Sequence, residues 1–149
     1  MKLYNTLLFL AFTLILFSCK KNSTNSNSPV QLLTQQSWKL TAQRWNLNNS
    51  GWLDSYQNQP VCRRDNIITY YSDFNLINDE GPTKCNSLDP QIFKTATWNF
   101  FSNNSKILIT EAAGTFSYEI LQLDTQTLKL LYKDSSAQQI SLSETTFSH

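Results

Sequence analysis

Apolar and polar residues alternate along much of this chain, which is the pattern of β-strands that bury one face. The alternation begins in residues 38–42 and continues in residues 45–47 after a shift of one position. One extra residue exchanges the two faces of a strand, so the shift predicts a β-bulge near Arg44. Just before this strand, the apolar residues of segment 30–33 have helical spacing and predict one turn of helix.

The segment 67–71 is rich in β-branched and aromatic residues, which favour a strand. Polar residues 72–75 interrupt the pattern, and Leu76 resumes it. Because side chains alternate between the faces of a sheet, we expect Ile68 and Tyr70 to point inward opposite Leu76. The sequence therefore predicts a β-hairpin in this region.

Alternating segments also follow the hairpin, at residues 95–101, 107–109, 115–121, 128–132 and 140–142. Turn-forming sequences separate them, including residues 102–105 and Asp134–Ser136. With the earlier segments they predict eight short strands and no long helix. Eight antiparallel strands can close on one another, which leaves no exposed edge. We therefore expect an all-β fold, an eight-stranded antiparallel up-and-down barrel; an open β-sandwich is the alternative.

Residues 48–61 are rich in Asn, Ser, Gly, Gln and Pro, and they predict a long loop. Trp52 and Tyr56 lie within it. Because loops commonly carry binding surfaces, these two aromatic side chains are candidate contacts for a partner protein. The alternative is that they cover an edge of the core.

Cys62 precedes the predicted hairpin and Cys85 follows it, so the hairpin brings both cysteines to the same end. The chain has no CxxC motif and no histidine near either cysteine, and the spacing fits no zinc site. A structural disulfide is therefore expected rather than metal ligation or redox catalysis. In the chain-entropy account, closing a loop of this length stabilises the fold by about 3 kcal/mol.

Residues 1–18 predict a signal peptide, because Lys2 precedes an apolar core too short to cross a bilayer. The run 16–19, Leu-Phe-Ser-Cys, resembles the lipobox of bacterial lipoproteins. That resemblance implies that Cys19 is diacylated and becomes the mature N-terminus, which would anchor the protein to a membrane. An ordinary signal peptide, or a membrane anchor with an incidental cysteine, is the alternative.

Residues 19–29 form a polar, low-complexity stretch and predict a flexible linker after the lipidated cysteine. Residues 30–149 are the right length for one domain. The formal net charge of +1 includes Lys2, so the mature chain is close to neutral. A neutral chain with scattered charges has no electrostatic basis for nucleic-acid binding.

His149 is the only histidine in the sequence, and we expect it to be disordered. The usual histidine-based catalytic triads and metal sites therefore have no candidate. Three acidic residues, Asp79, Glu80 and Glu111, could serve in acid–base chemistry, but the first two precede Gly81-Pro82 and are expected in a solvated turn. The sequence predicts no enzyme, no metal and no cofactor.

Several short motifs together resemble the lipocalin-like domains of Bacteroidetes lipoproteins. They are residues 32–41, Cys62-x-x-Asp65, residues 79–81 with Lys84-Cys85, Asp89-Pro90, and residues 97–100. The family implies an eight-stranded barrel with Trp38 near its closed end and the opposite mouth open to a small apolar ligand. Gln36 and Phe74 stand where the family usually has glycine. A phenylalanine in a left-handed turn is strained, so we expect the turn at Phe74 to be remodelled.

These features predict a lipoprotein of the bacterial cell envelope, anchored in the outer membrane and facing the periplasm, with surface exposure as the alternative. A small hydrophobic ligand is expected in the barrel, and the candidate lining residues are aromatic: Trp38, Tyr70, Trp98, Phe100, Phe116, Tyr118 and Tyr132. The alternative is a barrel packed solid in a structural or accessory lipoprotein that contacts an envelope protein. The volume of any interior cavity separates the two hypotheses.

Overall fold

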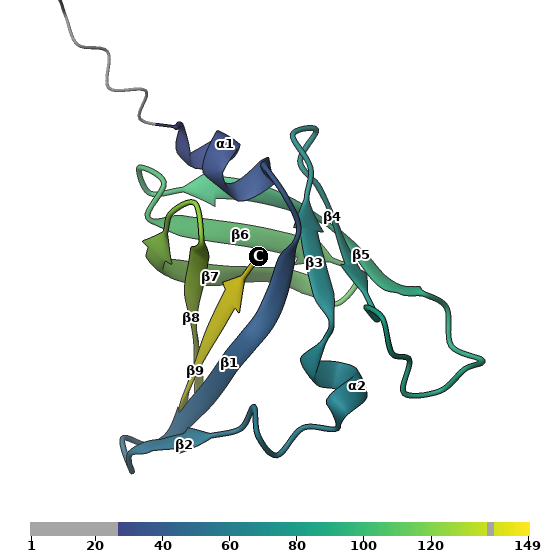
Figure 1. Ribbon diagram of the computed structural model, residues 1–149. Helices are drawn as coiled ribbons and strands as arrows, with labels where there is room; N and C mark the ends of the chain where they lie inside the picture. The colour runs from purple at the N-terminus through teal and green to yellow at the C-terminus, as the bar shows by residue number, and fades with distance from the viewer. Residues whose placement is uncertain (1–26, 137–138) are drawn as a thin grey trace, which may run out of the picture.

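The computed structural model describes residues 27–136 and 139–149 (Figure 1). This part of the chain contains two short helices, α1 (Pro29–Thr34) and α2 (Val61–Arg64). It also contains the strands β1 (Trp38–Leu47), β2 (Trp52–Asp54), β3 (Ile67–Tyr70), β4 (Asn75–Asp79), β5 (Ile92–Phe101), β6 (Lys106–Glu111), β7 (Gly114–Leu123), β8 (Thr127–Ser136) and β9 (Gln139–Ser148). The predicted signal peptide, Cys19 and most of the predicted linker lie outside the described residues.

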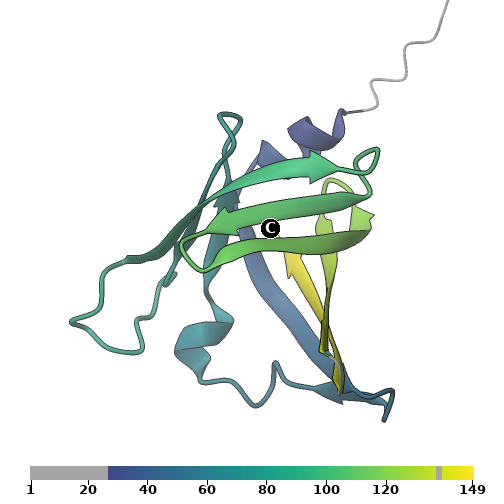
Figure 2. The same ribbon diagram turned by 180° about the vertical axis from the view of Figure 1, so that it is seen from behind.

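Strands β1 and β3 to β9 form a closed antiparallel barrel. Each strand pairs with its neighbour in the chain, and β9 returns to pair with β1. The view from behind shows β5, β6 and β7 as one wall of this barrel (Figure 2). The predicted eight-stranded up-and-down barrel is confirmed, and the β-sandwich alternative is wrong. Residues 27–149 hold the whole barrel and its core, so they have the features of a self-contained folding unit.

Strand β2 adds a ninth strand that lies outside the barrel and pairs with the second half of β1. The prediction of one long loop over residues 48–61 is therefore wrong, because this segment contains β2 and the start of α2. All three β2 side chains are exposed. A strand without a buried face has no alternation of apolar and polar residues, so the sequence pattern could not reveal it.

The β-bulge in β1 lies at Thr41, three residues before the predicted position at Arg44. Leu40 pairs with Phe147 and Ala42 pairs with Thr146, which leaves Thr41 without a partner in the ladder. Ala42 consequently lies on the exposed outer face. Alanine is small enough to occupy either face of a sheet. Ala42 was interpreted as an inward residue because it is apolar, and the bulge was therefore predicted too late in the chain.

The predicted turn at Asp134–Ser136 is also wrong. These residues continue β8 and pair with residues 139–141 of β9. Turn-forming residue types gave a misleading signal here because Asp134 and Ser135 are exposed. An exposed strand end accepts polar residues that would be unfavourable in a buried one.

Helix α1 covers one end of the barrel (Figure 1). Its first turn is capped by the Ser28 hydroxyl, which accepts a hydrogen bond of 3.1 Å from the Gln31 backbone nitrogen. Leu33 and Trp38 have no exposed surface, and the Trp38 indole nitrogen donates to the Leu33 carbonyl oxygen at 2.9 Å. The helical turn predicted for residues 30–33 is thus confirmed, and it closes the barrel at the Trp38 end.

His149 is ordered, contrary to prediction. Its ring lies against Trp38 with the centroids 3.9 Å apart, and its Nδ1 atom is 2.7 Å from the Ser37 carbonyl oxygen. The antiparallel pairing of β9 with β1 brings the end of β9 beside the start of β1, which explains the contact.

The predicted hairpin of β3 and β4 is confirmed, with Tyr70 directly opposite Leu76. Its turn is not remodelled as expected, since Phe74 keeps a left-handed backbone with φ of 67°. The Phe74 nitrogen donates to the Tyr71 carbonyl oxygen at 3.0 Å, and its ring packs on Trp98. These contacts hold a conformation that a side chain other than glycine rarely adopts.

Candidate functional site

A cavity of about 310 Å³ lies inside the barrel, and its lining includes Asn66, which follows α2. Helix α2 lies at the end of the barrel away from α1, and we call this end of the cavity its mouth (Figure 1). All eight barrel strands contribute to its wall. The lining residues are Leu40, Gln43, Asn66, Ile67, Ile68, Tyr70, Leu76, Asn78, Phe93, Lys94, Ile109, Glu111, Tyr118, Leu130, Tyr132, Ser143, Thr145 and Phe147. The volume lies at the lower end of the range of roughly 300–1,000 Å³ found for small-molecule sites.

The inner part of the cavity is mainly apolar. Ile68, Leu76 and Leu130 line it and belong to the same buried cluster as Trp38 and Trp98. These side chains come from buried strand positions that alternate with less buried residues, so the barrel's pleat directs them inward. The inner wall therefore offers apolar surface to a bound molecule.

Three tyrosines interrupt this apolar wall. Tyr70 is only 1% exposed, and its ring makes an edge-to-face contact with Trp98 at a centroid distance of 5.7 Å. Tyr118 and Tyr132 pair across β7 and β8, with their ring centroids 5.3 Å apart. Burial raises the pKa of Tyr70 far above its usual value, and the nearby Tyr118 phenol raises it further. Tyr70 therefore remains a neutral hydroxyl group throughout the physiological range.

Burial also raises the pKa of Tyr118, with an added contribution from Tyr132. In both cases the neighbouring tyrosine raises the pKa because two phenolate charges would repel each other. Tyr70, Tyr118 and Tyr132 all line the cavity, and we call their three phenol groups the polar track.

The mouth of the cavity carries the only two charged residues of its lining, and their charges are opposite. Lys94 at the start of β5 forms an ion pair with Glu111 at the end of β6. The Glu111 side chain is 13% exposed and the Lys94 side chain is 42% exposed. The pair is an ion contact without good hydrogen-bond alignment, because a buried oxygen of Glu111 has no aligned donor among the described residues. The two charges neutralise each other at the opening.

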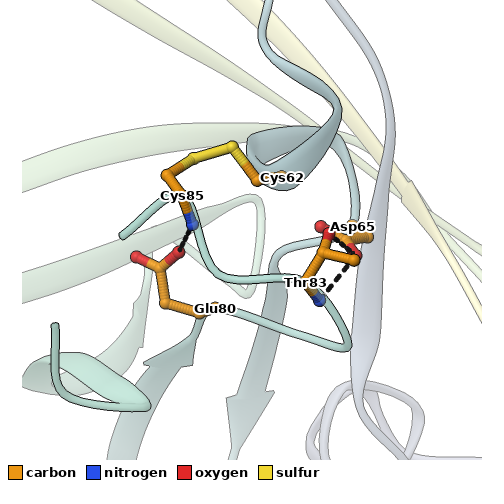
Figure 3. Close-up of a disulfide and its surroundings, with 5 residues drawn as sticks. All are labelled: Cys62, Asp65, Glu80, Thr83 and Cys85. Atoms are coloured by element: carbon orange, nitrogen blue, oxygen red, sulfur yellow. Dashed lines mark hydrogen bonds between the residues drawn. A yellow bond between two sulfur atoms is a disulfide. The ribbon is translucent and has the colours of Figure 1, made fainter. Parts of the chain in front are cut away.

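The disulfide of Cys62 and Cys85 holds the loops beside this mouth (Figure 3). The predicted bond is confirmed, with the two Cα atoms 5.1 Å apart. It joins α2 to the connection between β4 and β5. Nearby, the Asp65 carboxylate accepts hydrogen bonds from the Thr83 nitrogen at 3.0 Å and the Thr83 hydroxyl at 2.5 Å.

Asn66 and Gly81 link this loop to the cavity wall. With its amide nitrogen turned toward them, Asn66 donates to the carbonyl oxygens of Cys62 at 3.1 Å and Glu80 at 3.2 Å. Gly81 has a φ of 71°, and a Cβ atom there would lie 2.1 Å from the Asp65 carbonyl oxygen. Only glycine fits this close approach of two backbones. The mouth is thus fixed by a covalent bond, hydrogen bonds and close packing.

The predicted lining residues divide into two groups. Tyr70, Tyr118 and Tyr132 line the cavity. Trp38, Trp98 and Phe100 pack in or against the core nearer the closed end, while the Phe116 ring contacts the Tyr132 ring at 6.1 Å without lining the cavity. Facing inward was therefore a necessary condition for lining the cavity but not a sufficient one.

The predicted loop aromatics lie near the mouth and contact arginines. Trp52 is 39% exposed and stacks under Arg44, whose guanidinium carbon is 4.6 Å from the ring centroid. The Tyr56 hydroxyl donates to the Arg64 carbonyl oxygen at 3.5 Å. Arg44 in turn pairs with the buried carboxylate of Glu144 at 2.8 Å. Tyr56 is half-buried, whereas Trp52 is exposed.

The sequence analysis missed the polar members of the lining, above all Lys94 as the partner of Glu111. A signal for both was present. Inward positions on β5 recur at every second residue through Trp98 and Ala96, and one more step reaches Lys94. The same step beyond Ile107 and Ile109 on β6 reaches Glu111. Extending the alternation past the last apolar residue would have placed this ion pair inside the mouth.

Among the described residues, no three histidine, cysteine or acidic side chains lie close enough together to hold a metal ion. None of the helices in residues 27–136 and 139–149 is long and apolar enough to cross a bilayer. The chain matches no model of a known protein family, and it matches none of the curated proteins.

Proposed function

We propose that this protein is a lipid-anchored lipoprotein of the bacterial envelope and that its barrel binds a small, largely apolar molecule. The observation that carries the proposal is the cavity of about 310 Å³ lined by all eight barrel strands. A barrel of this size is just wide enough either to be filled by side chains or to hold one ligand. Space inside this barrel favours the ligand.

Native mass spectrometry of residues 27–149, secreted into a bacterial periplasm so that the disulfide forms, tests the ligand. Thr145→Trp should place an indole in the cavity, because Thr145 lines it. Thr97→Trp makes the same change on the exposed face of β5 and serves as the matched control. The wild-type and Thr97→Trp domains should retain a small molecule that Thr145→Trp excludes. A wild-type domain that carries no molecule and takes up no apolar probe would contradict the proposal.

The anchor is supported by residues 16–19 and the apolar segment before them. Two acyl chains hold a protein on a membrane far more durably than one, because each buried methylene contributes about 0.8 kcal/mol. Metabolic labelling with an alkyne fatty acid should label the full chain, and Cys19→Ala should abolish the label. Ser26→Ala, a change in the same linker, should leave it intact. Labelling that persists in the Cys19→Ala chain would remove the anchor from the proposal.

A second candidate function is contact with an envelope protein through β2. Leu53 is 55% exposed and lies opposite Trp45 of β1, which is 39% exposed, on a strand that projects from the barrel. Exposed apolar residues that lie together favour a protein partner over solvent. Photo-crosslinking from position 53 in living cells should capture one discrete protein, whereas crosslinking from exposed Thr97 on another wall should not.

A further inference from the structure

The buried hydroxyl of Tyr70 has no hydrogen-bond partner among the described residues. The side chain itself is 1% exposed. A buried hydroxyl without a partner is unfavourable, and native proteins normally satisfy such groups. The surrounding core does not require one, since Ile68, Leu76 and Trp98 would pack against a phenylalanine ring equally well. The hydroxyl is therefore unexplained by the packing of the barrel.

Its position points to the cavity. Tyr70 lines the cavity wall, and so does Tyr118, the neighbour that raises the pKa of Tyr70. Tyr70 and Tyr118 thus border the same interior space, and the Tyr70 ring also makes an edge-to-face contact with Trp98. The hydroxyl itself is covered by neighbouring protein atoms, so a ligand oxygen reaches it when a lining side chain beside it moves aside.

The charges around the cavity restrict what that molecule can be. Apart from the tyrosines, Lys94 and Glu111 are the ionisable residues of the lining, and they pair with each other at the mouth. The inner wall around Tyr70 therefore offers no cation to a carboxylate and no anion to an amine. A charged group placed there would lose its hydration without gaining a partner.

We propose that the cavity takes an uncharged, mainly apolar molecule with a hydrogen-bond-accepting oxygen at its inner end, and that the Tyr70 hydroxyl donates to this oxygen. Ketones, esters and ethers are suitable classes. This inference rests on the proposed function, because it names the ligand chemistry of the same cavity. Tyr118 and Tyr132 also line the cavity, so a second polar group of the ligand can bind to their hydroxyl groups.

The test compares three naphthalene probes that differ in one substituent: the methyl ketone acetonaphthone, the hydrocarbon ethylnaphthalene and the carboxylate naphthoate. Binding to residues 27–149 is measured by fluorescence at about pH 7, where the carboxylate is ionised. The variants are Tyr70→Phe and, as matched control, Tyr71→Phe, which removes the same atom from a neighbouring residue that is 43% exposed. Circular dichroism confirms that each variant is folded.

The wild-type domain should bind the ketone more tightly than the hydrocarbon, and naphthoate most weakly. Tyr70→Phe should weaken ketone binding by about 3- to 10-fold, the effect of one hydrogen bond, and leave hydrocarbon binding unchanged. Tyr71→Phe should leave both unchanged. The infrared carbonyl stretch of a carbon-13-labelled ketone should lie at lower frequency in the wild type than in Tyr70→Phe.

The outcomes separate this inference from the proposed function. Equal binding of ketone and hydrocarbon by the wild type, with no effect of Tyr70→Phe on the carbonyl stretch, would overturn the role of Tyr70 and leave the binding function standing. Naphthoate binding tighter than ketone binding would overturn the uncharged ligand. Failure of all three probes to bind would overturn the inference together with the proposed function.

Discussion

Phe74 and Trp98 are joined by two contacts: their rings lie 5.3 Å apart between centroids, and the Trp98 backbone nitrogen donates to the Phe74 carbonyl oxygen at 2.9 Å. The side-chain contact stabilises the hairpin turn, while the left-handed backbone at Phe74 opposes it. The turn therefore combines a favourable contact with a strained residue.

Two substitutions separate these opposing effects. Phe74→Ala removes the ring and keeps the strain, whereas Phe74→Gly removes both. We expect the free energy of unfolding of Phe74→Gly to exceed that of Phe74→Ala by about 1 kcal/mol, measured by urea denaturation. At Asn75, in the extended strand β4, the order should reverse, because glycine weakens a strand relative to alanine. Identical stabilities for the two Phe74 variants would show that the backbone there carries no strain.

The stacking of His149 on Trp38 should contribute to stability although His149 is exposed. Aromatic pairs are worth about 0.5–1.5 kcal/mol beyond their buried area. We expect His149→Ala to lower the free energy of unfolding by an amount in this range and His149→Phe to retain most of it. An alanine variant as stable as the wild type in urea would mean that the ring contact does not persist in solution.

The disulfide between Cys62 and Cys85 closes a loop with a sequence separation of 23 residues. Replacing both cysteines by serine should lower the free energy of unfolding by about 2–4 kcal/mol, mainly because the unfolded chain gains freedom. Urea denaturation of the double variant measures this. Reduction of the wild type should give the same shift, and an unchanged urea midpoint after reduction would contradict the prediction.

Tyr70 should make the barrel sensitive to alkali. Burial raises its pKa in the folded protein, and the Tyr118 phenol adds a smaller increase. In the unfolded chain the pKa of tyrosine is about 10. Below that pH neither state loses the proton, so Tyr70 gives stability no pH dependence. Above it the unfolded state releases a proton that the folded state keeps, so stability falls as pH rises. The fall in thermal midpoint above that pH should be smaller in Tyr70→Phe than in Tyr71→Phe.

Long strands with one buried face could be predicted from the sequence because their alternation has a single interpretation. The β3–β4 hairpin, the inward direction of Tyr70 and the disulfide all followed from that pattern. Strand β2 and the end of β8 could not, because their exposed side chains follow no alternation. The bulge at Thr41 was misplaced because Ala42 is compatible with either face.

The candidate site was harder to predict than the fold. Trp98 and Tyr70 both face inward, yet Trp98 fills the core and Tyr70 borders the cavity. Which inward side chain meets empty space depends on the packing of all eight strands at once. Alternation along one strand carries no such information.

The seam between β1 and β3 is the shortest strand pairing of the barrel. It consists of Trp38 opposite Ile68 and Lys39 opposite Ile67, whereas β8 and β9 pair from Thr127 opposite Ser148 to Ser136 opposite Gln139. A ligand too large for the cavity can enter only if two neighbouring strands separate. Separating β1 from β3 breaks the fewest backbone hydrogen bonds. The barrel wall is thus easiest to open along this seam, because β1 and β3 pair only near Trp38 and remain unpaired with each other toward the mouth.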